Sequence, residues 1–207
     1  MTNLTNYANQ YSQNGTCYIE CNSSPFTLDN LTKINDYCAK VPKEFVKIGD
    51  AGESNHLLVG RFQTDIEEPK LVNRKYSEEI FKIINSNEVL GFIKHVINYD
   101  GDLYVRRIQF NKIEKGCFIG YHLDIDSNPD YLAAGVIQFG DSYEGGLYRV
   151  YKPNSKKEYI DYKTKKNSLI ISNCLFPHEV TEVESGSRET LVFFVSNHKN
   201  KNNRYKS

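Results

Sequence analysis

The stretch HEVTEVESGSRETLVFFV, residues 178–195, decides the fold prediction. Apolar and polar residues alternate through much of it, as they do in half-buried strands. Ser-Gly-Ser at positions 185–187 interrupts the alternation with residues that are typical of turns. The stretch therefore predicts a β-hairpin of two strands, 178–183 and 188–195.

Polar residues at the start of each predicted strand have side chains suited to binding. His178 opens the first strand and Arg188 opens the second, so we expect the hairpin to bring both into one pocket. Thr190 shares a strand face with Arg188, because side chains two residues apart point the same way. A guanidinium group beside a hydroxyl group is a good receptor for a terminal carboxylate.

His122 and Asp124 form a second pair of candidate residues. They are also two residues apart, so an extended strand places both on one face. Together with His178 they make a set of two histidines and one carboxylate, which leaves three positions of an iron ion open. As ordinary surface residues of a β-sandwich they would match the order and spacing with Arg188 only by coincidence. We therefore interpret them as an iron site.

The rest of the chain predicts an α+β fold with a β-rich second half. Residues 101–197 contain about eight short strand-like segments separated by turn residues, which is typical of a jelly roll. The other six segments are 104–111, 118–124, 133–139, 146–151, 158–162 and 168–172. We expect a double-stranded β-helix (jelly-roll, cupin-like) core with N-terminal supporting helices.

The N-terminal half shows helical periodicity in three places. Residues 25–100 are expected to be mainly helical, with helices that begin near Leu28, Ser77 and Asn87. Residues 1–24 are polar and turn-rich, with a short strand around positions 17–21, and residues 198–207 form a basic, solvated tail. The whole chain, 1–207, is predicted to be a single domain.

Composition excludes several classes of partner. The chain has 26 basic and 26 acidic residues and a formal net charge of zero, so no global field favours nucleic acid or an anionic membrane. Five cysteines, an odd number without CxxC pairs, favour free thiols in a reducing compartment. We find no apolar signal core and no spanning segment, so we expect a cytoplasmic protein with neither membrane nor nucleic acid as partner.

From Tyr104 to Val195 the chain resembles the 2-oxoglutarate and iron(II)-dependent oxygenases, in particular their prolyl hydroxylase-like branch. The resemblance includes a glycine six residues before the first histidine and a glycine pair that opens a strand. In order, the residues that carry it are Gly116, His122-Leu-Asp124, Gly145-Gly146, Lys166-Asn-Ser-Leu-Ile-Ile-Ser172, Phe176-Pro-His-Glu-Val180 and Arg188.

This resemblance implies iron(II) bound by His122, Asp124 and His178, with 2-oxoglutarate as co-substrate, O2 as oxidant and ascorbate as an accessory reductant. It also implies hydroxylation of an unactivated C–H bond, with succinate and carbon dioxide as co-products. Halogenating relatives replace the carboxylate ligand by Gly or Ala, so Asp124 favours hydroxylation, or less often desaturation or ring formation.

The resemblance implies further that the far carboxylate of 2-oxoglutarate reaches Arg188. Many relatives carry a tyrosine on the early strand that helps to hold this co-substrate. Here Lys112 and Ile113 occupy that region, so Thr190 and Gln138 are the candidates for the second carboxylate contact.

The function is left open between two substrate classes and a non-catalytic alternative. An amino-acid-like small molecule is favoured, because the chain is close to the minimum for this fold and shows no peptide-binding module. A peptidyl, prolyl-type hydroxylase is the second reading. A non-catalytic sensor of iron and 2-oxoglutarate is the alternative from another class, and a nucleic-acid demethylase is disfavoured because no basic face interleaved with aromatic residues occurs.

Overall fold

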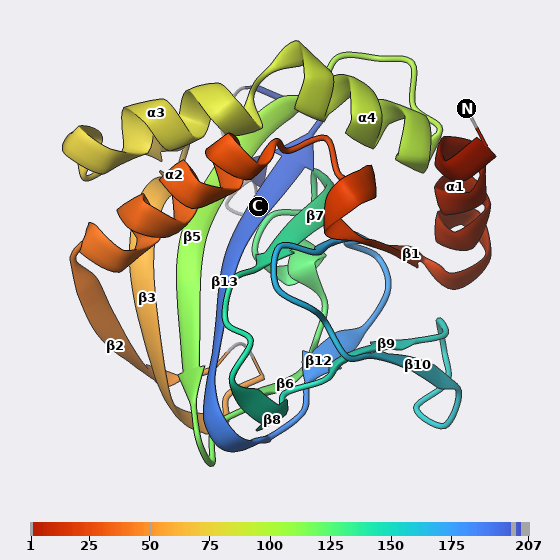
Figure 1. Cartoon of the computed structure of the whole chain (residues 1–207). Helices are drawn as coiled ribbons and strands as arrows, with labels where there is room; N and C mark the ends of the chain where they lie inside the picture. Colours follow the sequence, from red (N-terminus) through yellow and green to blue (C-terminus); the bar gives the residue numbers. More distant parts are fainter. Residues whose placement is uncertain (1, 50, 200–201, 204–207) are drawn as a thin grey trace.

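A computed structural model describes residues 2–49, 51–199 and 202–203 (Figure 1). Its larger sheet has nine strands, with β1, β11, β7, β13, β5, β3 and β2 in this order, while β4 pairs with β3 and β8 with β13. The bounds in that order are Thr16–Ile19, Leu169–Asn173, Tyr131–Gln138, Val183–Ser196, Tyr104–Glu114, Ser54–Asp65 and Lys43–Ile48, then Pro69–Leu71 for β4 and Tyr143–Gly145 for β8. The pairings are antiparallel.

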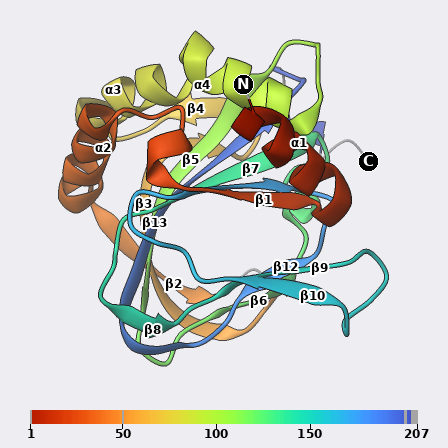
Figure 2. The ribbon, with the colours of Figure 1, turned by 45° about the vertical axis from the view of Figure 1, so that its right-hand side comes forward.

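A smaller, four-stranded sheet faces the larger one, as Figure 2 shows. Its strands, in sheet order, are β10 (Tyr159–Tyr162), β9 (Tyr148–Tyr151), β12 (His178–Val180) and β6 (Ile119–His122). Two facing antiparallel sheets make the predicted jelly roll, so the fold prediction is confirmed.

The four helices of the described residues cover the outer face of the larger sheet (Figures 1 and 2). They are α1 (Thr2–Asn14), α2 (Leu28–Lys40), α3 (Arg74–Ile84) and α4 (Asn87–Ile97), and two short 3-10 turns are η1 (Cys21–Ser23) and η2 (Asp124–Asp126). Thr27 and Ser86 cap the starts of α2 and α4, since their hydroxyl oxygens accept hydrogen bonds from the amides of Asn30 and Val89. None of the helices in the described ranges has the length and apolar character that crossing a bilayer requires.

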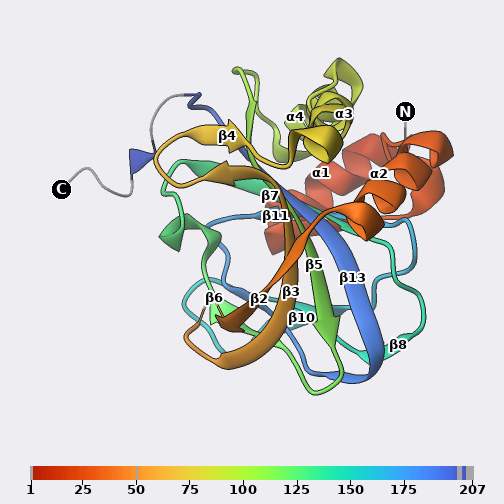
Figure 3. The same cartoon turned by 90° about the vertical axis from the view of Figure 1, so that its left-hand side faces the viewer.

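Strands β5 and β13 lie side by side through the middle of the larger sheet (Figure 3) and alternate between its two faces. On the outer face, Ile108 and Phe110 of β5 and Leu191 and Phe193 of β13 join the apolar core beneath the helices. The ring of Phe193 lies over Gly135 of β7, where a Cβ atom would collide with it. The opposite face looks into the space between the two sheets.

The predicted hairpin of residues 178–195 is wrong in one respect. Its first strand is β12 of the smaller sheet, and its second is part of β13 in the larger sheet, so the two strands do not pair with each other. Gly186 has a positive φ of 72°, but it lies within β13, which pairs with β8 there before it pairs with β5. Residues 185–187 therefore bend a continuous strand.

The N-terminal half contains more strand and the first residues more helix than the sequence predicts. The mainly helical range 25–100 includes β2, β3 and β4, which extend the larger sheet beyond β5. Residues expected to be turn-rich form α1, which packs on α4 through Tyr7 and Phe92, with ring centroids 6.4 Å apart. In the tail, Asn202 is buried and donates a hydrogen bond to the carbonyl oxygen of Asp65. The prediction of a solvated tail is therefore wrong at this residue.

Candidate metal centre

Two histidines and one aspartate meet where the smaller sheet ends. His122 is the last residue of β6 and His178 the first of β12, and the two are register partners across these strands. Asp124 follows in η2, and Leu123 between them is extended (φ −115°, ψ 134°), so the two-residue spacing still places both side chains on one side. One oxygen of Asp124 lies 3.7 Å from Nε2 of His122 and 3.6 Å from Nε2 of His178.

A β-bulge shapes this end of β6. His178 pairs with His122 and Val180 with Ile119, so two steps on β12 oppose three on β6. The extra residue lets both Ile119 and His122 line the same cavity, which strict alternation would forbid. Bulges of this kind re-aim side chains next to functional sites.

Backbone carbonyls fix the orientation of both imidazole rings. Nδ1 of His122 lies 2.7 Å from the carbonyl oxygen of Gly120, and Nδ1 of His178 lies 3.1 Å from that of Phe176. A carbonyl oxygen can only accept, so each Nδ1 donates its proton there, and each Nε2 is the ring nitrogen that faces Asp124. This arrangement of the outer ring nitrogen is typical of histidines that bind metals.

Asp124 is an ionised carboxylate in a buried place. Burial by itself raises the pKa of this carboxyl, but His178, His122 and Arg107 together lower the pKa below its usual value. Its second oxygen is buried and has no hydrogen-bond partner. A buried charge without enough partners is costly, and a cation among these three ligand atoms, which lie within 4.8 Å of one another, would remove that cost. The donor set fits an iron(II) ion with open positions.

Arg188 lies in the same cavity, on the wall opposite the smaller sheet. Its side chain is 2% exposed, and its Nε and Nη2 atoms have no hydrogen-bond partner. Burial lowers the pKa of this guanidinium, although arginine stays protonated in proteins. Gly146 makes room for it: φ is 56° there, and an added Cβ would lie 3.1 Å from Cδ of Arg188. The cavity thus offers two unsatisfied donors to an anion.

The structure brings Thr190 into the cavity but not Gln138. Thr190 lines the cavity on the same face of β13 as Arg188, as predicted. Gln138 is its neighbour on β7, yet its amide nitrogen donates to the carbonyls of Gly140 and Glu189, and its amide oxygen accepts from the hydroxyl of Thr164. The amide of Gln138 is therefore engaged by the protein.

Tyr148 is a cavity residue that the sequence reasoning missed. It is buried at the start of β9, with its ring centroid 5.4 Å from that of His178, and its hydroxyl group has no hydrogen-bond partner. Burial raises the pKa of this phenol, so the group stays protonated and remains a donor. The signal in the sequence was its position two residues after the Gly145-Gly146 pair.

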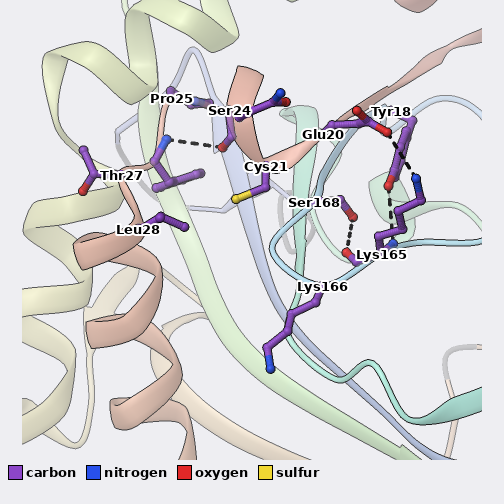
Figure 4. Close-up of a pocket in the computed structure, with 12 residues that line it drawn as sticks. Tyr18, Glu20, Cys21, Ser24, Pro25, Thr27, Leu28, Lys165, Lys166 and Ser168 are labelled. Atoms are coloured by element: carbon purple, nitrogen blue, oxygen red, sulfur yellow. Dashed lines mark hydrogen bonds and ion pairs between the residues drawn. The ribbon is translucent and has the colours of Figure 1, made fainter.

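A second hollow lies elsewhere, between β1, the start of α2 and the loop before β11 (Figure 4). Its volume is about 590 Å³, and its lysines are already paired: Lys165 contacts Glu20, and Lys166 contacts Asp141. None of the candidate site residues lines it. This hollow is larger than the cavity at the metal centre, so the functional site cannot be recognised by volume alone.

Comparison with known proteins identifies the family. Residues 108–196 match the 2OG-Fe(II) oxygenase superfamily. A crystal structure of an oxidoreductase of the 2OG-Fe(II) oxygenase family from Burkholderia pseudomallei is 32% identical over 97% of this chain and 93% of its own, with a TM-score of 0.89. A search of curated proteins gave no match.

More distant structures share the fold. A prolyl-4-hydroxylase from Pseudomonas putida is 13% identical, covers 94% of this chain and 99% of its own, and has a TM-score of 0.67. The 2-oxoglutarate-dependent epimerase SnoN from nogalamycin biosynthesis is 8% identical, covers 94% and 81%, and has a TM-score of 0.72.

The jelly roll and these matches define an oxidoreductase that uses iron(II) and 2-oxoglutarate. This chain belongs to the 2-oxoglutarate and iron(II)-dependent oxygenase family.

Proposed function

We propose that the protein hydroxylates an unactivated C–H bond of an amino-acid-like small molecule and converts 2-oxoglutarate to succinate and carbon dioxide. In this proposal His122, Asp124 and His178 bind iron(II), and Arg188 with Thr190 binds the far carboxylate of 2-oxoglutarate. The observation that carries it is a single cavity lined both by a three-donor set and by a buried arginine with two unpaired nitrogens.

The residues of the chain have separate tasks in this reaction. Bound iron(II) and 2-oxoglutarate supply the oxidising chemistry that joins one oxygen atom of O2 to a substrate carbon. His122, Asp124 and His178 would hold the metal, and three protein ligands would leave coordination positions open for small ligands. Arg188 would orient the co-substrate through its unpaired guanidinium nitrogens, and the apolar side chains of Val136 and Val192 would limit the entry of water.

Asp124 supports hydroxylation as the outcome, because a carboxylate occupies the position that an anion would need for halogenation. We further infer that residues 1–207 act as one domain. The helices of the N-terminal half bury their apolar faces on the same sheet whose other face carries Arg188. A peptidyl residue is the alternative substrate, and the assay below includes it.

The test is succinate release by protein purified without oxygen and then supplied with iron(II), 2-oxoglutarate and air. We expect one iron per chain, slow succinate release without substrate, and faster release with the true substrate from a panel of amino acids, dipeptides and proline-containing peptides. His178→Ala should lose most iron affinity and more than about 100-fold in rate, since two ligands do not fix the metal. His95→Ala is the matched control, because His95 is exposed on α4.

Two results would contradict the proposal. Full iron occupancy in His178→Ala would show that His178 is not a metal ligand. If succinate release by the unmodified protein is no higher than that of His122→Ala with every compound of the panel, the protein is not an enzyme of this kind. Tight binding of iron and 2-oxoglutarate without succinate would instead favour a sensor.

A further inference from the structure

We propose that Arg107 binds a carboxylate group of the substrate at the mouth of the cavity, so that the protein acts on a small free carboxylic acid and not on a residue inside a peptide chain. This inference rests on the proposed function and assigns a specificity-determining residue to it.

The inner face of β5 and β13 forms a floor with an arginine at each end. The register pairs Ile113 with Arg188, Asn111 with Thr190, Gln109 with Val192, and Arg107 with Phe194. The two ends are six residue steps apart along either strand, or about 20 Å at a rise of about 3.4 Å per residue. Arg188 is fully buried at one end, whereas Arg107 is partly exposed at the other. Two anions could therefore bind the same floor without competing.

The polar residues of β5 hold Arg107 in place through its Nε and leave the two terminal nitrogens of its guanidinium fork free. Its Nε donates to the amide oxygen of Gln109 at 2.8 Å, and the amide nitrogen of Gln109 donates to Asn111 at 2.9 Å. The guanidinium also lies over the ring of Phe194, 5.6 Å from its centroid. Neither terminal nitrogen has an acceptor among the residues that the structure describes. Two parallel donors of this kind match a carboxylate.

Charge balance in the cavity favours an anionic substrate. Asp124 is the sole carboxylate, and Arg107 and Arg188 are the sole arginine or lysine side chains, among the described residues that line it. Once iron(II) and the dianion of 2-oxoglutarate are bound, their charges and those of Asp124 and Arg188 cancel. The charge of Arg107 then has no counter-ion in the cavity, and one carboxylate on the substrate would neutralise it.

The surroundings of Arg107 explain how a substrate reaches it. Arg107 and Ser127 line both this cavity and an adjoining hollow of about 350 Å³. Asp65 also lines the hollow, but its carboxylate is occupied by the guanidinium of the neighbouring Arg106 and by Asn128. A molecule that enters through the hollow meets the free fork of Arg107 before it meets Asp124.

The experiment compares free acids with their amides. The compounds are the standard L-amino acids, each as the acid and as the carboxamide, together with N-acetylated, C-amidated peptides. Each compound is assayed for stimulation of succinate release. Calorimetry then measures its binding to the anaerobic complex of the protein with iron and 2-oxoglutarate. We expect at least one acid to stimulate release with a KM about tenfold or more below that of its amide. Arg107→Gln should raise the KM of that acid about tenfold or more and leave that of the amide unchanged, since a hydrogen-bonded charge pair is lost only for the acid. Arg149→Gln is the matched control: its guanidinium is held by Asp161 and Glu179, outside the cavity lining.

The outcomes separate this inference from the proposed function. Absence of substrate-independent succinate would count against the proposed function. With such succinate present, equal response to acid and amide in every pair, including no response at all, overturns the role of Arg107. Stimulation by capped peptides overturns it too, and so does an equal loss for acid and amide in Arg107→Gln.

Discussion

The two faces of the larger sheet are made by the same strands and serve different ends. On the outer face, β5 and β13 present Ile108 and Phe193 to an apolar core under the helices. On the inner face, the same strands present Gln109 and Arg188 to a cavity. Because side chains alternate with a period of two, a strand can contribute to stability with every second residue and to binding with the others. The two functions can therefore be disturbed separately.

The faces also differ in how their groups are satisfied. The outer face relies on close contacts, such as the ring of Phe193 over Gly135. The cavity gathers polar atoms without hydrogen-bond partners: one oxygen of Asp124, two nitrogens of Arg188 and the hydroxyl of Tyr148. Each such atom costs about 1–3 kcal/mol when left buried and unpaired. Ligands that pair these atoms would recover that free energy, which makes the cavity a place that ligands complete.

The largest difference between the two faces is expected in the stability effects of substitutions at two neighbouring residues of β13. Phe193→Ala should lower the free energy of unfolding by about 3–5 kcal/mol, because a fully buried ring leaves a void in the core. Val192→Ala, one residue away on the cavity face, should cost less than about 2 kcal/mol, because its partly buried side chain borders the cavity. Urea unfolding of both variants measures this difference. Equal losses would show that the cavity face is packed like a core.

A functional effect without a comparable structural one is expected at Arg188. Arg188→Ala should raise the KM for 2-oxoglutarate about 30-fold or more while iron binding persists, because the charge-assisted contacts to the carboxylate are lost. Arg188→Lys should recover only part, since a point charge does not reproduce the fork. The 2-oxoglutarate dependence of succinate release and the iron content measure this, with Arg149→Ala as control. An unchanged KM would transfer the co-substrate contact to another residue.

Sequence reasoning predicted the cavity face of β13 because alternation is a local property. Arg188 and Thr190 share a face in any extended strand, and His122 and Asp124 stay together because Leu123 is extended. The hairpin prediction was wrong at Gly186, because a glycine with positive φ occurs both in turns and in bends within a strand. Only the pairing with β8 distinguishes the two, and that pairing depends on distant residues.

The missed elements have non-local causes as well. Helix α1 is polar and has weak intrinsic helical signals, and it is held by packing on α4. Strand β2 lies at the edge of the sheet with Phe45 and Ile48 exposed, so it lacks the pattern of a half-buried strand. Tyr148 was missed because its role depends on the position of β9 beside β12, where Tyr148 is the register partner of Val180.

The smallest predicted effect tests whether an unpaired cavity group is there for a ligand. Tyr148→Phe removes a buried hydroxyl without a partner, so the protein free of metal and 2-oxoglutarate should become slightly more stable, by up to about 1 kcal/mol. If the hydroxyl donates to 2-oxoglutarate, the same change should weaken co-substrate binding about tenfold, as expected for the loss of a hydrogen bond to a charged acceptor. The two effects have opposite signs, which a loss of packing would not produce. Thermal unfolding of the ligand-free variant and calorimetric titration with 2-oxoglutarate measure them, and Tyr121→Phe is the matched control because Tyr121 packs on Tyr151, outside the cavity lining. A variant that is less stable and binds 2-oxoglutarate as the unmodified protein does would show that Tyr148 serves packing. The ligand-binding part of the cavity would then not include this residue of β9.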